Sequence, residues 1–142
     1  MQLQEQREQK EQSCVFCKIV TGEISDYRVW ENDNFIAFLD SHPITDAHTL
    51  IVPKQHTDYV FDLSDSEYVA LFNVAKIIAP AIKKITKCQK VGLVIEGLGV
   101  RHVHLHLIPI SEINGLDPHK AHAVSTESLE EMQKKLKTTL AV

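Results

Sequence analysis

The stretch HVHLHLI, residues 102–108, places a histidine at every second position of an otherwise apolar segment. Side chains alternate between the two faces of a strand, so the three histidines share one face and the aliphatic residues between them share the other. A single histidine on such a face is most often an ordinary half-buried residue. Three neighbouring imidazoles would crowd one another and repel when charged, so the alternation favours a chemical role for His102, His104 and His106.

Two kinds of chemistry suit these rings. Imidazole is the commonest transition-metal ligand, but His102 and His106 have Cα atoms about 13 Å apart on a strand, while a zinc–nitrogen bond is only ~2.0–2.1 Å. All three could share one ion only if the outer pair leaned sharply inward. Alternatively, one neutral ring attacks an α-phosphate and forms a phosphorus–nitrogen bond that water later breaks, while its neighbours donate to the phosphate oxygens. The spacing favours separate roles for the three rings.

Composition limits the other function classes. The formal net charge of −4 argues against general nucleic-acid binding, and no apolar run approaches the ~18 residues of a membrane span. The first twelve residues, MQLQEQREQKEQ, lack the apolar centre of a secretion signal, so we expect a frayed or disordered tail over residues 1–12 and one domain over residues 13–142. Three cysteines without a signal peptide indicate a reducing compartment, and we expect the cytoplasm.

The elements around the histidines predict an α+β domain. YRVWE and NFIAFLD form a hairpin around Asn32-Asp33, residues 41–47 form a loop, and residues 48–53 form the next strand. Residues 91–97 and 102–110 form a second hairpin.

Two helices complete the predicted domain. A capping box at Ser64 to Glu67 starts a long helix with one apolar stripe, which Pro80 should kink or end. A second capping box, Ser128 to Glu131, starts the C-terminal helix. The sequence therefore predicts an antiparallel sheet of about five strands with a long helix and a C-terminal helix packed on it.

The histidine stretch resembles the signature of the histidine triad (HIT) superfamily of nucleotide hydrolases and transferases. Four upstream segments extend the resemblance to the Hint-like branch, in the same order: CVFCKIVTGEI, FIAFLD, HTLIVPKQH and the helix from Ser64. It covers residues 14 to 110. The resemblance implies a HIT-like fold, a homodimer, and cleavage of nucleoside 5′-phosphate derivatives at the α-phosphate, the substrate being a phosphoramidate or a dinucleoside polyphosphate.

The resemblance also implies a role for individual residues. His104 would be the nucleophile that becomes nucleotidylated, and His106 and His48 would contact the phosphate. Asp40 would bind the ribose hydroxyls, with Phe38 and Leu39 near the nucleoside. From the residues alone, Asp40 before Pro43 would be an ordinary turn residue.

A second site follows from the same resemblance. Cys14-x-x-Cys17 alone is a weak signal, because two thiols in one segment can be packing residues. Bacterial-type Hint-like proteins use the positions of Cys14, Cys17, His56 and His102 as zinc ligands. Together these four would form a closed Cys₂His₂ tetrahedron, the geometry of structural Zn²⁺.

The sequence departs from the Hint-like pattern in the loop before the histidines. The loop is only residues 96–101, and Ile95 and Gly99 stand where an amide and a hydroxyl are expected. We expect Arg101, or backbone amides of the Gly97 to Gly99 turn, to supply the missing phosphate donors. The alternative is that Arg101 is a solvated charge at the sheet edge.

Two other functions stay open. A non-catalytic nucleotide-binding or partner-binding module would keep the fold and the zinc, while the altered loop would have lost turnover. A metal-dependent hydrolase would use the histidine strand as ligands.

Overall fold

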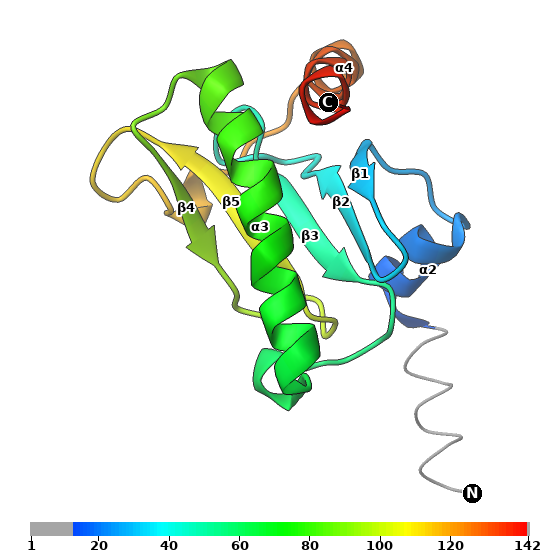
Figure 1. Cartoon of the computed structure of the whole chain (residues 1–142). Helices are drawn as coiled ribbons and strands as arrows, with labels where there is room; N and C mark the ends of the chain where they lie inside the picture. The colour runs from blue at the N-terminus through cyan, green and yellow to red at the C-terminus, as the bar shows by residue number, and fades with distance from the viewer. Residues whose placement is uncertain (1–12, 142) are drawn as a thin grey trace, which may run out of the picture.

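The computed structural model describes residues 13–141, so the predicted tail over residues 1–12 lies outside the described part. Its core is one antiparallel sheet with the strand order β1-β2-β3-β5-β4 (Figure 1). The strands are β1 (Arg28–Glu31), β2 (Phe35–Leu39), β3 (Thr49–Pro53), β4 (Lys90–Val94) and β5 (Leu105–Ile110). The helices are α2 (Val15–Thr21), α3 (Asp65–Thr86) and α4 (Thr126–Leu140). The α+β architecture predicted from the sequence is confirmed.

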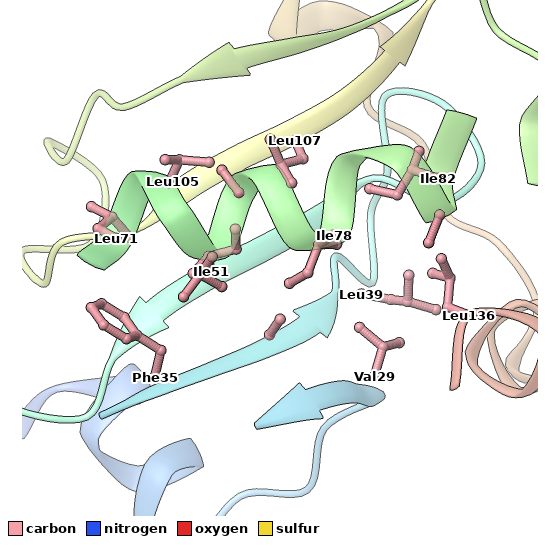
Figure 2. Packing of buried hydrophobic residues seen from close by; sticks show 14 of the residues in the cluster. Val29, Phe35, Leu39, Ile51, Leu71, Ile78, Ile82, Leu105, Leu107 and Leu136 are labelled. Atoms are coloured by element: carbon pink, nitrogen blue, oxygen red, sulfur yellow. The ribbon is translucent and has the colours of Figure 1, made fainter. Parts of the chain in front are cut away.

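The neighbouring interior strands β2 and β3 are buried along their whole length, because both faces of the sheet are covered there. On one face, alternate residues such as Ala37 and Ile51 pack against α3 and α4, with Ile78 and Leu136 in the same cluster (Figure 2). On the other face, Ile36, Phe38, Leu50 and Val52 pack against α2. The predicted histidines point to this second face, so α2 lies beside them.

Helix α3 begins where its capping residue predicts. Ser64 Oγ accepts the backbone N–H of Glu67 at 3.2 Å, which satisfies one of the unpaired donors of the first turn. Pro80 does not end the helix, because α3 continues to Thr86. Pro80 and Lys76 both lie on the exposed side, so the Lys76 carbonyl that loses its helical donor can be hydrated instead.

The last strand begins later than the sequence indicates. β5 starts at Leu105, so His102 and His104 lie in an extended segment before the strand rather than within it. β5 starts late because the backbone N–H of Val103 donates to the Thr57 carbonyl at 2.7 Å and not to a neighbouring strand. The alternation nevertheless persists, since Val103 packs in the α3 cluster while the rings of His102 and His104 contact Phe16 of α2.

The C-terminal helix begins earlier than predicted. Its N-cap is Ser125, whose Oγ accepts the N–H of Ser128 at 3.1 Å, so Ser128 is a helical residue rather than the cap. The apolar side of α4 is as predicted, because Leu129 and Leu136 are buried and Met132 packs against the same cluster.

Candidate functional site

Strand pairing brings three distant polar residues together at one end of the sheet. β3 pairs with β5 through Leu50 and His106, so His48, just before β3, lies beside the His106 ring. Asp40 follows β2, and its backbone N–H donates to the His48 carbonyl at 2.9 Å. The carboxylate of Asp40 lies 3.6 Å from His48 Nε2. We call Asp40, His48, His104 and His106 the imidazole cluster.

Hydrogen bonds to the backbone define which nitrogen of each ring carries the proton. His48 Nδ1 accepts the N–H of Ile44 at 3.0 Å, so the neutral ring carries its proton on Nε2. That Nε2–H donates to His106 Nδ1 at 2.8 Å. His106 is therefore left with its proton on Nε2, where it can donate to an anionic ligand.

Burial keeps two of these rings neutral. The pKa of His106 is lowered to about 3, first by burial and then by the neighbouring charges of His104 and His48. Burial also lowers the pKa of His48, although the carboxylate of Asp40 opposes the shift. At neutral pH both rings act as neutral hydrogen-bonding groups.

His104 presents the opposite nitrogen. Its Nδ1–H donates to the backbone carbonyl of His102 at 2.7 Å, so the lone pair of the neutral ring is on Nε2. The ring is 7% exposed, and its centroid lies 5.0 Å from that of His106. An unprotonated Nε2 on His104 beside an Nε2–H on His106 is the combination that nucleophilic attack on a phosphate requires.

A second cluster gathers thiols and imidazoles from three segments. Cys14 and Cys17 come from the start of α2, His56 from the loop after β3, and His102 from the segment before β5. We call these four residues the thiol cluster. Their ligand atoms all lie within 4.8 Å of one another.

The distances in the thiol cluster fit a tetrahedral ion. Around zinc, two nitrogens should be about 3.3 Å apart and a sulfur and a nitrogen about 3.6 Å apart. The two Nδ1 atoms of His56 and His102 are 3.2 Å apart. The three measured sulfur–nitrogen distances are 3.3 Å (Cys17 to His56), 3.4 Å (Cys14 to His102) and 3.5 Å (Cys17 to His102). The donor set suits zinc in both its geometry and its chemistry.

A hydrogen bond outside the cluster supports the same role. The Nε2–H of His102 donates to the Pro53 carbonyl at 2.7 Å, which leaves Nδ1 as the coordinating nitrogen. Metal-bound histidines usually make such a bond with the nitrogen that faces away from the metal. His102 therefore belongs to the thiol cluster through its ring, while its carbonyl belongs to the imidazole cluster.

The structure separates the two residues predicted near the nucleoside. Phe38 lies on the histidine face, where its ring meets Phe16 edge to face at 5.8 Å. Leu39 points to the opposite face and packs in the core with Leu136 (Figure 2). Leu39 also lines a cavity of about 160 Å³ beside α4, together with Asp40 and His48.

The structure places Gly99 and Arg101 beside the thiol cluster. Both line a pocket of about 300 Å³ together with Cys14 and His56. The Arg101 guanidinium, whose side chain is 69% exposed, lies 3.6 Å from the Asp58 carboxylate. This geometry favours a solvated charge rather than a phosphate donor.

Phe16 was not predicted as a site residue. Its ring meets that of His104 at 4.9 Å and that of His102 at 6.0 Å, both edge to face. A signal was present in the sequence, because Phe16 is the aromatic residue inside C-V-F-C, and any role for the two cysteines would also place its ring.

No helix within residues 13–141 is long and apolar enough to cross a membrane.

Comparisons with known proteins identify the family of the chain. The sequence model of the HIT domain family matches residues 21–113. An uncharacterized HIT-like protein of Mycoplasma genitalium is 37% identical over 124 residues, which cover 84% of this chain and 88% of that protein. The adenosine 5′-monophosphoramidase HNT1 of Candida albicans is 36% identical over an alignment of 147 positions, which covers 91% of this chain and 92% of that protein.

A solved structure shows the same fold. The zinc-bound histidine triad family protein of Mycobacterium smegmatis superposes with a TM-score of 0.79 at 30% identity, over 92% of this chain and 95% of that one. Sequence, fold and the arrangement of the histidines all lead to one conclusion. The chain belongs to the HIT domain family.

Proposed function

We propose that the protein is a nucleotide hydrolase or nucleotidyl transferase that cleaves nucleoside 5′-phosphate derivatives at the α-phosphate, with His104 as the nucleophile. One observation carries the proposal. The hydrogen bond from His104 Nδ1–H to the His102 carbonyl leaves the Nε2 lone pair available for attack. His106 lies beside it with a proton on Nε2, which suits a phosphate oxygen.

The proposed reaction has two steps. His104 Nε2 forms a bond to the α-phosphorus while the bond from phosphorus to the amine or second nucleotide breaks. The leaving group departs with a proton from solvent. The oxygen of a water molecule then bonds to the phosphorus while the phosphorus–nitrogen bond breaks, which releases the nucleoside monophosphate, regenerates His104 and returns one proton to solvent.

The other members of the imidazole cluster hold the phosphate in this proposal. His106 donates to a phosphate oxygen, and His48 orients His106 through the 2.8 Å hydrogen bond. Because burial lowers the pKa of both rings, neither loses its role to protonation near neutral pH. Asp40 would accept from the ribose hydroxyls, and the ring of Phe38 lies on the same face for the nucleoside. The phosphoramidase activity named for the Candida albicans relative supports a phosphoramidate substrate, with a dinucleoside polyphosphate as the second class.

We also propose that the thiol cluster holds a structural zinc ion. Its distances fit a tetrahedron, and the similar Mycobacterium smegmatis protein is zinc-bound. Four protein ligands leave no open coordination position, so the ion ties α2 to the loop after β3 and to the segment before β5. Thiolate ligands need a reducing compartment, which favours the cytoplasm.

A homodimer through α3 is the third part of the proposal. A row of aromatic rings crosses the surface at the start of α3, with successive centroids 5.4, 6.4 and 5.0 Å apart: Tyr59, Phe61, Tyr68 and Phe72. Phe61 is 68% exposed and Val69 56%, and a second copy would cover such a surface. Light scattering on Val69→Asp, expected to be monomeric, tests this against a dimeric wild type.

The proposed activity has a direct test. The protein is mixed separately with adenosine 5′-phosphoramidate and with a diadenosine polyphosphate. Each reaction is quenched during turnover, and the protein is examined by mass spectrometry for AMP on His104. We expect the adduct in the wild type and none in His104→Asn. Turnover of neither substrate, with no adduct, would leave the non-catalytic binding module as the better function. Activity that a chelator abolishes without unfolding the protein would favour the metal-dependent hydrolase.

A further inference from the structure

Phe16 connects the two clusters. It lies between Cys14 and Cys17 in α2, and it is buried. Its ring meets His102 of the thiol cluster and His104 of the imidazole cluster edge to face, the preferred geometry for such pairs. One side chain therefore contacts both a candidate metal ligand and the candidate nucleophile.

The second restraint on His104 comes from the thiol cluster too. The hydrogen bond that holds Nδ1 ends on the carbonyl of His102. His102 is itself held by the Pro53 carbonyl and by its Nδ1 in the cluster. A shift of either α2 or His102 would therefore change a direct contact of the His104 ring.

The ring of His104 needs these restraints. The last side-chain torsion of histidine is broad and roughly two-fold, so an unrestrained imidazole turns over easily. A half turn would take Nδ1 away from the His102 carbonyl and Nε2 away from its direction of attack. The carbonyl and the edge contact from Phe16 together select one orientation.

We propose that Phe16 and His102 are positioning residues for the nucleophile, so that metal binding by the thiol cluster sets the orientation of the His104 ring. The inference rests on the proposed function of His104. Cys14, Cys17 and His56 hold α2 and His102 in place. Phe16 and the His102 carbonyl, which contact the His104 ring, then fix the orientation of that ring.

A matched pair of variants separates positioning from packing. Phe16→Leu keeps an apolar side chain but removes the aromatic ring that contacts His102 and His104. Ile19→Val trims the other buried residue of α2, which packs in the same apolar cluster. If α2 only supplied apolar contacts, both variants should behave alike.

Four measurements are made on each variant. The single-turnover rate of AMP transfer to His104 reports positioning, and the Kd for AMP reports binding. The imidazole nitrogen signals, recorded by NMR at about pH 8, report the tautomer of His104 directly and need no activity. Metal content is determined on the same samples.

We expect Phe16→Leu to keep its zinc and to bind AMP within about twofold of the wild type. It should transfer AMP to His104 about 10-fold more slowly, because a small displacement of a reacting group slows the reaction more than it weakens binding. Its His104 signals should shift from the Nδ1–H form toward a mixture. Ile19→Val should keep the wild-type rate within about twofold and the wild-type tautomer. Cys17→Ser should lose metal and show the same mixed tautomer as Phe16→Leu.

Other outcomes overturn the inference. A wild-type rate and tautomer in Phe16→Leu would remove Phe16 as a positioning residue. Weaker AMP binding with an unchanged transfer rate would make it a binding residue instead. If the wild type itself forms no adduct, the proposed function fails, but the NMR comparison still decides whether Phe16 and the thiol cluster orient His104.

Discussion

The thiol cluster and the imidazole cluster lie next to each other and both contain histidines, yet their rings are held in different ways. In the thiol cluster, the two Nδ1 atoms are 3.2 Å apart and converge with two sulfurs on one point. In the imidazole cluster, His48 and His106 approach to 2.8 Å as donor and acceptor, and the neutral ring of His104 has its lone pair on Nε2. Convergence of lone pairs suits a metal, while alternation of donor and acceptor suits proton and phosphate chemistry.

The difference shows how one residue type takes separate roles a few positions apart. His102 donates its Nε2–H to a carbonyl and presents Nδ1. His104 does the reverse, donating Nδ1–H and presenting Nε2. The role of each ring therefore follows from the backbone carbonyl that its other nitrogen finds.

Removal of the nucleophile should have the largest effect. We expect His104→Ala to lower kcat by about 10⁴-fold or more, because it removes the nucleophile that the proposed reaction requires. Zinc content and Tm should change little. His119→Ala is the matched control, since this side chain is 93% exposed, belongs to neither cluster and should keep full activity. Substantial turnover by His104→Ala would assign the nucleophile elsewhere.

Loss of a ligand should break the thiol cluster and lower the stability of the protein. We expect Cys17→Ser to lose stoichiometric zinc and to lower the free energy of unfolding by about 3 kcal/mol or more, which corresponds to a fall in Tm of about 10 °C. Metal analysis and calorimetry measure both. Cys88→Ser is the control, because this thiol lies outside both clusters. An unchanged Tm in Cys17→Ser would show that the cluster carries no structural ion.

The neutral state of His106 predicts a particular response to acid. The pKa is about 3 in the folded protein and about 6.5 in the unfolded chain. As pH falls from about 6.5 toward 3, the unfolded chain takes up a proton that the folded ring does not, so this residue makes the free energy of unfolding decrease. Urea titrations at about pH 7 and pH 5 should show a smaller decrease for His106→Asn than for the wild type.

Any effect of acid on the thiol cluster should be the same in both proteins, so the difference between their two decreases isolates the contribution of the His106 ring. Equal decreases in both would mean that His106 is not kept neutral by burial.

Backbone strain lies beside the imidazole cluster. Ala47, just before His48, has a φ of 72°, a region that costs an L-residue about 1–2 kcal/mol. Glycine relieves this strain but loses more chain entropy, so we expect Ala47→Gly to raise the free energy of unfolding by up to about 1 kcal/mol. Ala121→Gly is the control: its φ of −60° carries no such strain, so this change should not raise the free energy of unfolding. A lower Tm in Ala47→Gly would show that the Ala47 methyl contributes more packing than strain.

The exposed charge at Arg101 should matter least. Its ion pair with Asp58 is long and largely solvated, so Arg101→Ala should change stability by less than about 0.5 kcal/mol and leave kcat/KM within about twofold. A clear fall in kcat/KM would restore Arg101 as a donor to the phosphate. The residues beside the thiol cluster would then contribute to the reaction directly.

Local signals predicted much of this fold. The cap at Ser64, the hairpin around Asn32 and the alternation through the histidines are properties of short segments, and the structure contains all three. The start of β5 could not be predicted in this way, because it depends on Val103 donating to Thr57, 46 residues earlier in the chain. Likewise Ser125 and Ser128 are both good caps, and only the path of the chain into α4 selects Ser125.

By itself the sequence determined which side chains share a face, because alternation along an extended chain places His102, His104 and His106 together. It also supplied the thiols for a metal. Tertiary structure alone decided which nitrogen of each ring carries a proton. The deciding groups are the Ile44 N–H and the carbonyls of His102 and Pro53. These are backbone groups that every sequence has, and only folding brings the right one to each ring.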